Sequence, residues 1–233
     1  RLLRASLTKS ARLLLRRWKL LIIRTAETAG FCFGVDRAVG LVYKSLENGK
    51  TATLGEIIHN PDVVRDMQSK GVRIISSPGE AESDETVVIR SHGVADSIYR
   101  ELEENNIRYI DGTCPYVSRI HKIVREKSEV GYTVVIMGDS AHPEVEGIAG
   151  CCKSAPVVLP DDEALKKFLA EFCGNCEKGI AITAQTTYNI NIWDKCRRVV
   201  SESGVPCEMF DTVCRATNDR QTEAARLAEE SDI

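Results

Sequence analysis

The chain has 233 residues, of which 43% are hydrophobic and 28% charged, with 31 basic and 34 acidic side chains and a formal net charge of −3. This composition is typical of a globular protein with a full core, and it excludes a disordered, collagen-like or membrane-embedded chain. Nine cysteines, without a secretory signal or a small disulfide-rich frame, indicate cytosolic thiols available for metal or redox chemistry.

The two ends of the chain differ from its body. The first 24 residues hold eight lysines and arginines and no acid, which leaves 34 acids against 23 bases in the rest. We interpret residues 1–19 as a basic leader outside the fold, either translated upstream sequence or an Arg-rich targeting peptide. At the other end, the sequence stops after a helical run, where an α/β chain would enter its next strand. We therefore expect a truncated C-terminus.

Short β-branched runs alternate with amphipathic helical stretches along the chain. Apolar residues keep a helical spacing in 35–46, 117–124 and 164–169. Strands that alternate with such helices predict βαβ units with parallel sheets. The strand candidates are 20–24, 51–54, 72–75, 86–90, 107–110, 132–137, 156–159 and 180–183.

Three cysteines occupy equivalent places, each just before a helical stretch. Cys114 and Cys214 end two D-x-x-C motifs that lie 100 residues apart, and Cys32 precedes the first clear helix. At a helix N-terminus the dipole and the free N–H groups favour an anion, which lowers a thiol pKa and suits metal ligation. The alternative is that each cysteine is a small buried hydrophobe.

Three of the four histidines lie in turns between a strand candidate and a helical run. They are His59, His92 and His142, and Pro61 and Pro143 after two of them suit the first position of a helix. Ligands of parallel α/β sheets bind at such carboxyl-end turns, and histidines there suit phosphate groups. Each could instead be a helix cap. The fourth histidine, His121, lies inside a helical run and receives no role.

Two further features remain ambiguous from pattern alone. Gln185, Thr186 and Thr187 follow the strand candidate 180–183 and could contact a ligand or cap the next helix. The CxxC at 173–176 has the spacing of zinc and thioredoxin-like sites but no second ligand pair, so we interpret it as a surface turn. The other cysteines, 151, 152, 196 and 207, are predicted to be packing residues.

Three thiolates at one place would leave a metal centre with an open coordination position. Iron–sulfur clusters normally have four cysteine ligands, so three leave one iron free to bind a substrate oxygen. Three histidines around the same cavity would bind an anion such as a diphosphate. The residues alone thus indicate redox or dehydration chemistry on a phosphorylated molecule.

Several motifs follow one another in a fixed order along the chain: AGFCFGVDRAV (29–39), GEIIHNPDVV (55–64), SHGV (91–94), DGTCPYV (111–117), GDSAHPEVEGIAG (138–150), AQTT (184–187) and DTVCRATNDRQ (211–221). From about residue 20 to the end, they closely resemble the 4-hydroxy-3-methylbut-2-enyl diphosphate reductase family of the non-mevalonate isoprenoid pathway. The resemblance implies three pseudo-symmetric α/β units around a central 4Fe-4S cluster, at 20–110, 111–207 and 208–233, with the third incomplete.

The resemblance also implies roles for particular residues, position by position. Cys32, Cys114 and Cys214 match the cluster ligands, and Glu144 matches the proton-delivering acid. The residues that match the substrate-binding set are His59, His92, His142, Gln185, Thr186 and Thr187.

The implied reaction is a reductive dehydroxylation that consumes two electrons and two protons and yields isopentenyl and dimethylallyl diphosphate. A ferredoxin or flavodoxin is the implied electron donor, and a bacterial cytoplasm, rather than a plastid, the implied location. Two alternatives stay open: a quinolinate-synthase-like enzyme, and a non-catalytic iron–sulfur or zinc binding module. No nucleic-acid or membrane partner is expected, because the body of the chain is acidic and lacks a basic stripe with aromatics.

Overall fold

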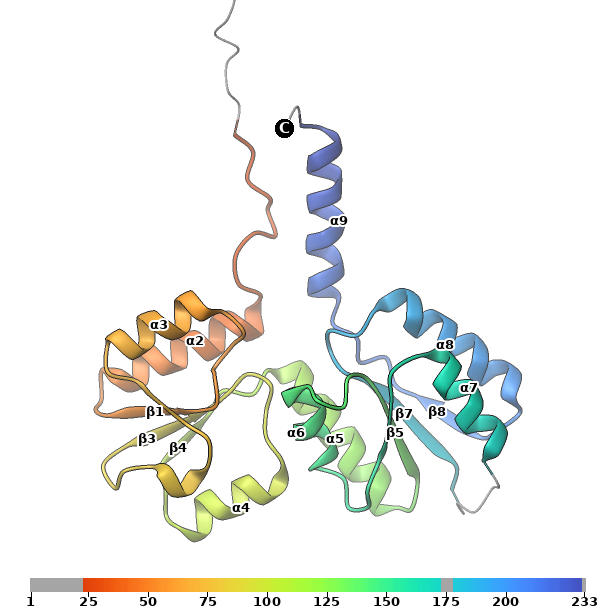
Figure 1. Cartoon of the computed structure of the whole chain (residues 1–233), viewed down its shortest axis with the longest axis horizontal. Coiled ribbons are helices and arrows are strands. Elements are labelled where there is room, and N and C mark those ends of the chain that lie inside the picture. The colour runs from red at the N-terminus through yellow and green to blue at the C-terminus, as the bar shows by residue number, and fades with distance from the viewer. Residues whose placement is uncertain (1–22, 173–177, 232–233) are drawn as a thin grey trace, which may run out of the picture. The chain divides into compact units, whose positions relative to one another are not determined.

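The computed structural model describes residues 23–172 and 178–231, and these residues form an α/β fold with two four-stranded parallel sheets (Figure 1). Residues Gly30–Asp219 form one compact unit that contains both sheets. The described residues before and after it group together as a second unit.

The first sheet has the strand order β2-β1-β3-β4, and every neighbouring pair is parallel. The helices α2 and α3 pack on one face of this sheet and α4 on the other. The elements are α2 (Phe33–Leu46), β1 (Thr51–Leu54), α3 (Pro61–Ser69), β2 (Arg73–Ile75), the 3-10 helix η1 (Pro78–Glu80), β3 (Thr86–Ile89), α4 (Asp96–Glu104) and β4 (Tyr109–Asp111).

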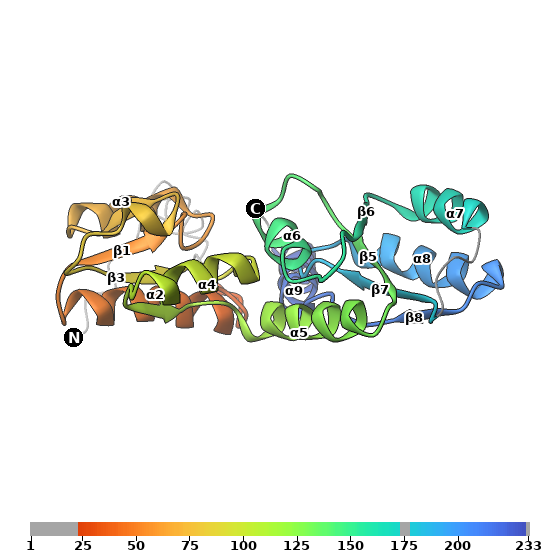
Figure 2. The ribbon, with the colours of Figure 1, turned by 90° about the horizontal axis from the view of Figure 1, so that it is seen from below.

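The second sheet repeats the pattern with the order β6-β5-β7-β8, again all parallel. Its helices α5 and α6 pack on one face, and α7 and α8 on the other; Figure 2 shows α5 and α7 on opposite sides of the sheet. The elements are α5 (Pro115–Glu129), β5 (Thr133–Met137), α6 (Pro143–Ala149), β6 (Val157–Leu159), α7 (Asp162–Glu171), β7 (Ile180–Ala184), α8 (Ile190–Ser203) and β8 (Cys207–Met209).

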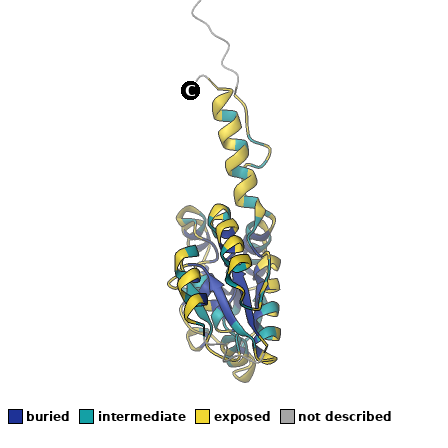
Figure 3. Cartoon of the chain, turned by 90° about the vertical axis from the view of Figure 1, so that its right-hand side faces the viewer, coloured by how far each residue is buried: buried dark blue, intermediate teal, exposed yellow. Residues whose placement is uncertain are grey.

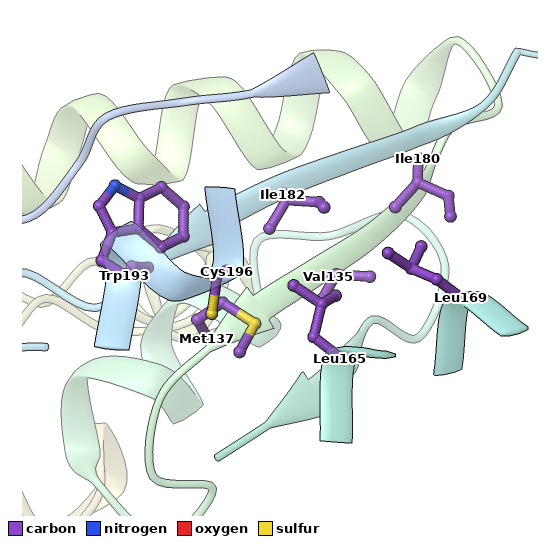
Figure 4. Packing of buried hydrophobic residues seen from close by; sticks show 9 residues of the cluster. Val135, Met137, Leu165, Leu169, Ile180, Ile182, Trp193 and Cys196 are labelled. Carbon is purple, nitrogen blue, oxygen red and sulfur yellow. The ribbon is translucent and has the colours of Figure 1, made fainter. Parts of the chain in front are cut away.

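The central strands are apolar on both sides because helices cover both faces of each sheet. In β5, Val134 and Ile136 contact the core formed with α5 and α6. Val135 and Met137 point the other way, toward Leu165 of α7 and the residues of α8 (Figure 4). This arrangement leaves the turns after the strands as the places where polar side chains can gather.

The predicted α/β class and parallel sheets are confirmed, and seven of the strand candidates coincide with or overlap observed strands. The strand predicted at 20–24 differs, because residues 23 and 24 are not in a strand and 20–22 lie outside the described residues. The edge strand β8 was not predicted, since its central residue Glu208 is charged. The Glu208 carboxylate accepts hydrogen bonds from Lys127 and Tyr132 at the surface.

The chain's end segments lie together in the second unit. The helix α9 (Arg215–Glu229) has no buried residue, as Figure 3 shows. The Glu223 carboxylate accepts hydrogen bonds from the backbone N–H groups of Glu27 and Thr28, at 2.7 and 2.8 Å. No third sheet occurs among residues 23–172 and 178–231, so the three-unit division stays a prediction.

Two other sequence predictions lie outside the part of the chain that the structure describes. These are the basic leader at 1–19 and the CxxC at 173–176. None of the described helices is long and apolar enough to cross a bilayer.

The core of the second sheet gives a stability prediction. Leu165 is fully buried, and Leu165→Ala should lower the free energy of unfolding by about 2–5 kcal/mol because it leaves a cavity. The exposed neighbour Lys166 provides the control, since Lys166→Ala should change stability by less than about 0.5 kcal/mol. Denaturant unfolding measures both, and equal losses would contradict the packing in Figure 4.

Candidate functional site

Two backbone hydrogen bonds in equivalent positions connect the cysteines to the turns at the strand ends. The N–H of Cys114 donates to the carbonyl of Ser91, two residues beyond β3, at 2.9 Å. The N–H of Cys214 donates to the carbonyl of Thr186, two residues beyond β7, at 2.7 Å. The D-x-x-C repeat of the sequence is therefore a repeat of structure.

All three predicted cysteines lie where a helix begins. Cys32 is the N-cap of α2, Cys114 is the N-cap of α5, and Cys214 directly precedes α9. They line one cavity of about 550 Å³. Gly34 lies in the first turn of α2, where an added Cβ would stand 2.4 Å from the Cys114 sulfur. The absence of a side chain at Gly34 keeps this sulfur accessible.

The pKa of Cys114 differs from the sequence expectation. Burial raises it, and the neighbouring thiols of Cys32 and Cys214 add to the increase. The backbone N–H groups of Tyr116 and Val117 lower it, as expected for a helix N-terminus, but they do not outweigh burial. A cation at this place would reverse the effect, because thiolates that ligate metals are stabilised by the metal's charge.

The donor set fits an iron–sulfur cluster with one free position. Among the described residues, three thiols and no other cysteine line the cavity. A cluster of four irons held in this way would have one iron without a protein thiolate. The cysteine ligand set remains a prediction that this geometry supports.

The three predicted histidines come together in space. The ring centroids of His59 and His92 are 4.4 Å apart, and His142 lies 5.5 Å from each. They come from three different turns, after β1, β3 and β5. Gly150, which ends α6, holds the third turn near the second: its carbonyl accepts from the N–H of Asp96, and a Cβ on it would lie 2.2 Å from the Cβ of Ala95.

The histidine cluster suits an anion better than a metal ion. Ligand nitrogens of the three rings lie within 4.8 Å of one another, which would allow a shared ion. However, the Nδ1 of His142 accepts the N–H of Glu144 at 3.1 Å, so its neutral ring carries the proton on Nε2. That nitrogen is then a donor, which binds phosphate oxygens, whereas a metal ion requires a bare nitrogen.

Burial affects the charge of the histidine cluster. It lowers the pKa of His92 to about 3, and His59, His142 and Arg90 act in the same direction. His92 is therefore neutral near pH 7 in the free protein. A bound polyanion would oppose this shift, because a nearby negative charge favours the protonated ring.

Glu144 is buried in the first turn of α6, and among the described residues its carboxylate accepts hydrogen bonds from Thr186. Its Oε1 accepts the backbone N–H of Thr186 at 2.5 Å, and its Oε2 accepts the hydroxyl of Thr186 at 2.7 Å. Burial raises the Glu144 pKa, and both hydrogen bonds from Thr186 lower it without cancelling the rise. A position in the first turn of a helix by itself favours the carboxylate, so it is burial that accounts for the raised pKa of Glu144.

Of the two threonines after β7, only Thr186 contacts Glu144. The hydroxyl of Thr187 instead accepts from the side-chain amide of Gln185 at 2.8 Å. The side-chain Oε1 of Gln185 accepts the backbone N–H of Asp139. Both Gln185 and Thr187 line a separate cavity of about 390 Å³. Thr186, rather than Thr187, therefore has the better position for proton transfer.

Ser91 is a residue that the sequence analysis did not identify. Its carbonyl accepts from Cys114, and its hydroxyl donates to the Ile57 carbonyl in the turn that leads to His59. It joins two histidine turns to a cysteine. Serine before a histidine is common in loops, so no sequence signal distinguishes it.

Parallel sheets whose strand-end turns bring together three histidines and a buried carboxyl group, with three thiols at helix starts, are the arrangement of an α/β enzyme. The LytB protein family model matches residues 23–233. The chain belongs to the LytB family, whose curated members are reductases. This assignment favours a reductase over a quinolinate-synthase-like enzyme or a non-catalytic binding module.

Several similar proteins share one name, 4-hydroxy-3-methylbut-2-enyl diphosphate reductase. The protein of Caldanaerobacter subterraneus subsp. tengcongensis is 39% identical over 217 residues, which cover 91% of this chain and 73% of the relative. The protein of Geobacter metallireducens is 38% identical over 211 residues, with 89% and 71% covered.

The solved structures similar to this chain include reductases of the same kind. A structure of (E)-4-hydroxy-3-methyl-but-2-enyl diphosphate reductase, described as the terminal enzyme of the non-mevalonate pathway, is 37% identical with a TM-score of 0.74, and the match covers 90% of this chain and 74% of that one. A Plasmodium falciparum diphosphate reductase, 24% identical with a TM-score of 0.73 over 83% of this chain and 61% of its own, shares the fold.

The raised pKa of Glu144 gives a prediction about pH. Because the pKa of Glu144 is higher in the folded protein than in the unfolded chain, the folded state holds the proton more tightly. The resulting contribution to the free energy of unfolding is fully present below the unfolded pKa and is lost as the pH rises through the folded pKa. Glu144→Gln cannot ionise, so the variant should gain stability relative to the wild type as the pH rises from about 4, the ordinary pKa of glutamate, to neutral. Denaturant unfolding across this range measures the difference.

Glu146→Gln is the matched control, since it removes an exposed carboxylate from the same helix. It should not reproduce the change with pH. A constant difference between Glu144→Gln and the wild type at all pH values would contradict the burial of an ionisable Glu144.

Proposed function

We propose that this chain reductively dehydroxylates 4-hydroxy-3-methylbut-2-enyl diphosphate to isopentenyl and dimethylallyl diphosphate, with two electrons and two protons, at a 4Fe-4S cluster. One observation carries the proposal. Thr186 donates both its N–H and its hydroxyl to Glu144 and accepts the N–H of Cys214 through its carbonyl. A single residue thus connects a buried acid to a metal-ligating thiol.

Cys32, Cys114 and Cys214 would hold the cluster in the cavity that they line. When bound, the cluster supplies electrons and a Lewis-acidic iron for the substrate oxygen. The protein's own contribution is to fix the three sulfurs at helix starts and to keep Gly34 free of a side chain beside Cys114.

The histidine cluster would bind the diphosphate. His142 donates through Nε2, because its Nδ1 is already occupied by the helix cap. His59 is exposed and accessible to a ligand, while His92 lies deeper. Rings from three separate turns would fix the orientation of the anion, so that the organic end of the substrate has a defined direction.

Glu144 would provide a proton through Thr186. Burial favours the neutral acid. When Glu144 carries a proton on Oε2, it donates to the Thr186 hydroxyl, and the direction of that hydrogen bond is reversed. The Thr186 hydroxyl is then free to donate to a leaving oxygen, which is the task of a general acid.

The electron donor and location follow from the same proposal. A small redox protein such as a ferredoxin or flavodoxin would supply electrons one at a time. Gln185 and Thr187 are proposed as further substrate contacts, on the cavity of about 390 Å³ that they line. A cytoplasmic location is proposed from the bacterial relatives.

The ligand assignment predicts the outcome of cysteine substitutions. Cys32→Ser and Cys214→Ser in the full chain should lose iron and sulfide after anaerobic reconstitution, because an alcohol is a poor iron ligand near neutral pH. Cys207→Ser, in the edge strand β8, should retain them. Iron and sulfide analysis with visible absorption measures this, and loss only in the Cys207 variant would refute the assignment.

The anion site predicts the outcome of a histidine substitution. His59→Gln removes an exposed donor and should weaken inorganic diphosphate binding by about 1.5–3 kcal/mol, the value of a charge-assisted hydrogen bond. Lys122→Gln removes a cation from the surface of α5 and should change the affinity less than about twofold. Calorimetric titration measures both, and equal affinities for the two variants would exclude His59 from the anion site, since the cap of α3 is Asn60.

A further inference from the structure

His121 lies under the turn that carries His92. It belongs to α5 and is 4% exposed. Its ring meets the backbone of Gly93: a Cβ on Gly93 would stand 2.6 Å from the Cε1 of His121 and 3.2 Å from its Nε2. Gly93 has a φ of +72°, so the close contact and the backbone conformation both require a glycine beside His92.

The same turn is held from other sides by weaker or longer contacts. The Arg90 Nε donates to the Gly93 carbonyl at 3.4 Å, and the Thr113 methyl group would stand 3.0 Å from a Gly93 Cβ. Cys114 is the N-cap of α5, the helix that carries His121, and its N–H donates to the carbonyl of Ser91. One rigid helix therefore contacts the residues on both sides of His92.

His121 is also an unusual core residue. Its Nε2 is buried and has no hydrogen-bond partner among the residues that the structure describes. Leaving such a group unpaired lowers stability, and an aliphatic side chain would fill the space without this cost. Stability alone therefore does not account for a histidine at this position.

The ring separates the His92 turn from a second cavity. This cavity of about 840 Å³ lies between α4 and α5, and His121 forms part of its wall with Tyr99 and Cys151. Without the imidazole, the turn would border an open space and could relax into it. An imidazole has a flat edge that fits against a backbone with no Cβ.

We propose that His121 is a positioning residue for His92, and that its ring, wedged against Gly93, fixes the orientation in which His92 meets His59 and His142. The inference rests on the proposed diphosphate site. The ring acts through the Gly93 backbone and does not itself contact the anion.

Two measurements on the full chain test this. The chain has four histidines, so labelled imidazole signals are few and assignable by NMR. His121→Ala should shift or broaden the His92 signal and weaken inorganic diphosphate binding about tenfold, since small displacements of a binding group are costly. Val124→Ala is the matched control: it removes a buried side chain from the same helix, in the core with β5 and α6 and away from Gly93.

The control should lower stability while the His92 signal stays unchanged and the diphosphate affinity stays within about twofold. Equal effects of both variants on His92 would overturn the proposal and indicate general loosening of α5. A wild type that binds no diphosphate would refute the proposed anion site, and the NMR comparison would still decide the role of His121.

A double variant extends the test and covers a failure of the alanine variant to fold. Gly93→Ala places a methyl group against the His121 ring, and removing that ring makes room for it. The His92 signal should therefore be displaced less in Gly93→Ala with His121→Ala than the two single changes together imply. Strict additivity would overturn the contact, and His121→Val, which also lacks the planar ring but leaves a smaller cavity, can replace the alanine in each comparison.

Discussion

The N–H groups of Cys114 and Cys214 each bind a carbonyl in the turn after a neighbouring strand, and the rest of the site depends on this constraint. Because the sheets are parallel, the turns after β3 and β7 lie at the carboxyl edges, where the cysteine of the next segment also arrives. The bond of Cys114 to Ser91 sets the turn of His92. The equivalent bond of Cys214 to Thr186 sets the partner of Glu144.

The same constraint explains why the chemistry is crowded into a few residues. The N–H and the hydroxyl of Thr186 both donate to the carboxylate of Glu144, and its carbonyl accepts the N–H of Cys214. Glu144 gains two hydrogen bonds and loses contact with water, so burial and hydrogen bonding act on its pKa in opposite directions. A buried acid with a hydroxyl as its immediate partner is suited to hold a proton until a reaction requires it.

Local patterns predicted the parts of the fold that local chemistry determines. Helical spacing and prolines placed the starts of α3 and α6 at Pro61 and Pro143, and the alternation of segments predicted parallel sheets. The sequence did not distinguish Thr186 from Thr187, because two adjacent threonines after a strand have the same local structural propensities. Only the tertiary contact of Thr186 with Glu144 separates them. His121 gave no signal, since one polar residue on a helix is ordinarily exposed.

The contact at Gly150 has a consequence for ligand selection. Its carbonyl binds the N–H of Asp96, and no side chain fits between it and Ala95. Even a methyl group there would act as a spacer that moves α6, and with it His142 and Glu144, away from the turn of His92. The spacing of the three histidines, and with it the width of the proposed anion site, therefore depends on Gly150, which lies outside the histidine cluster.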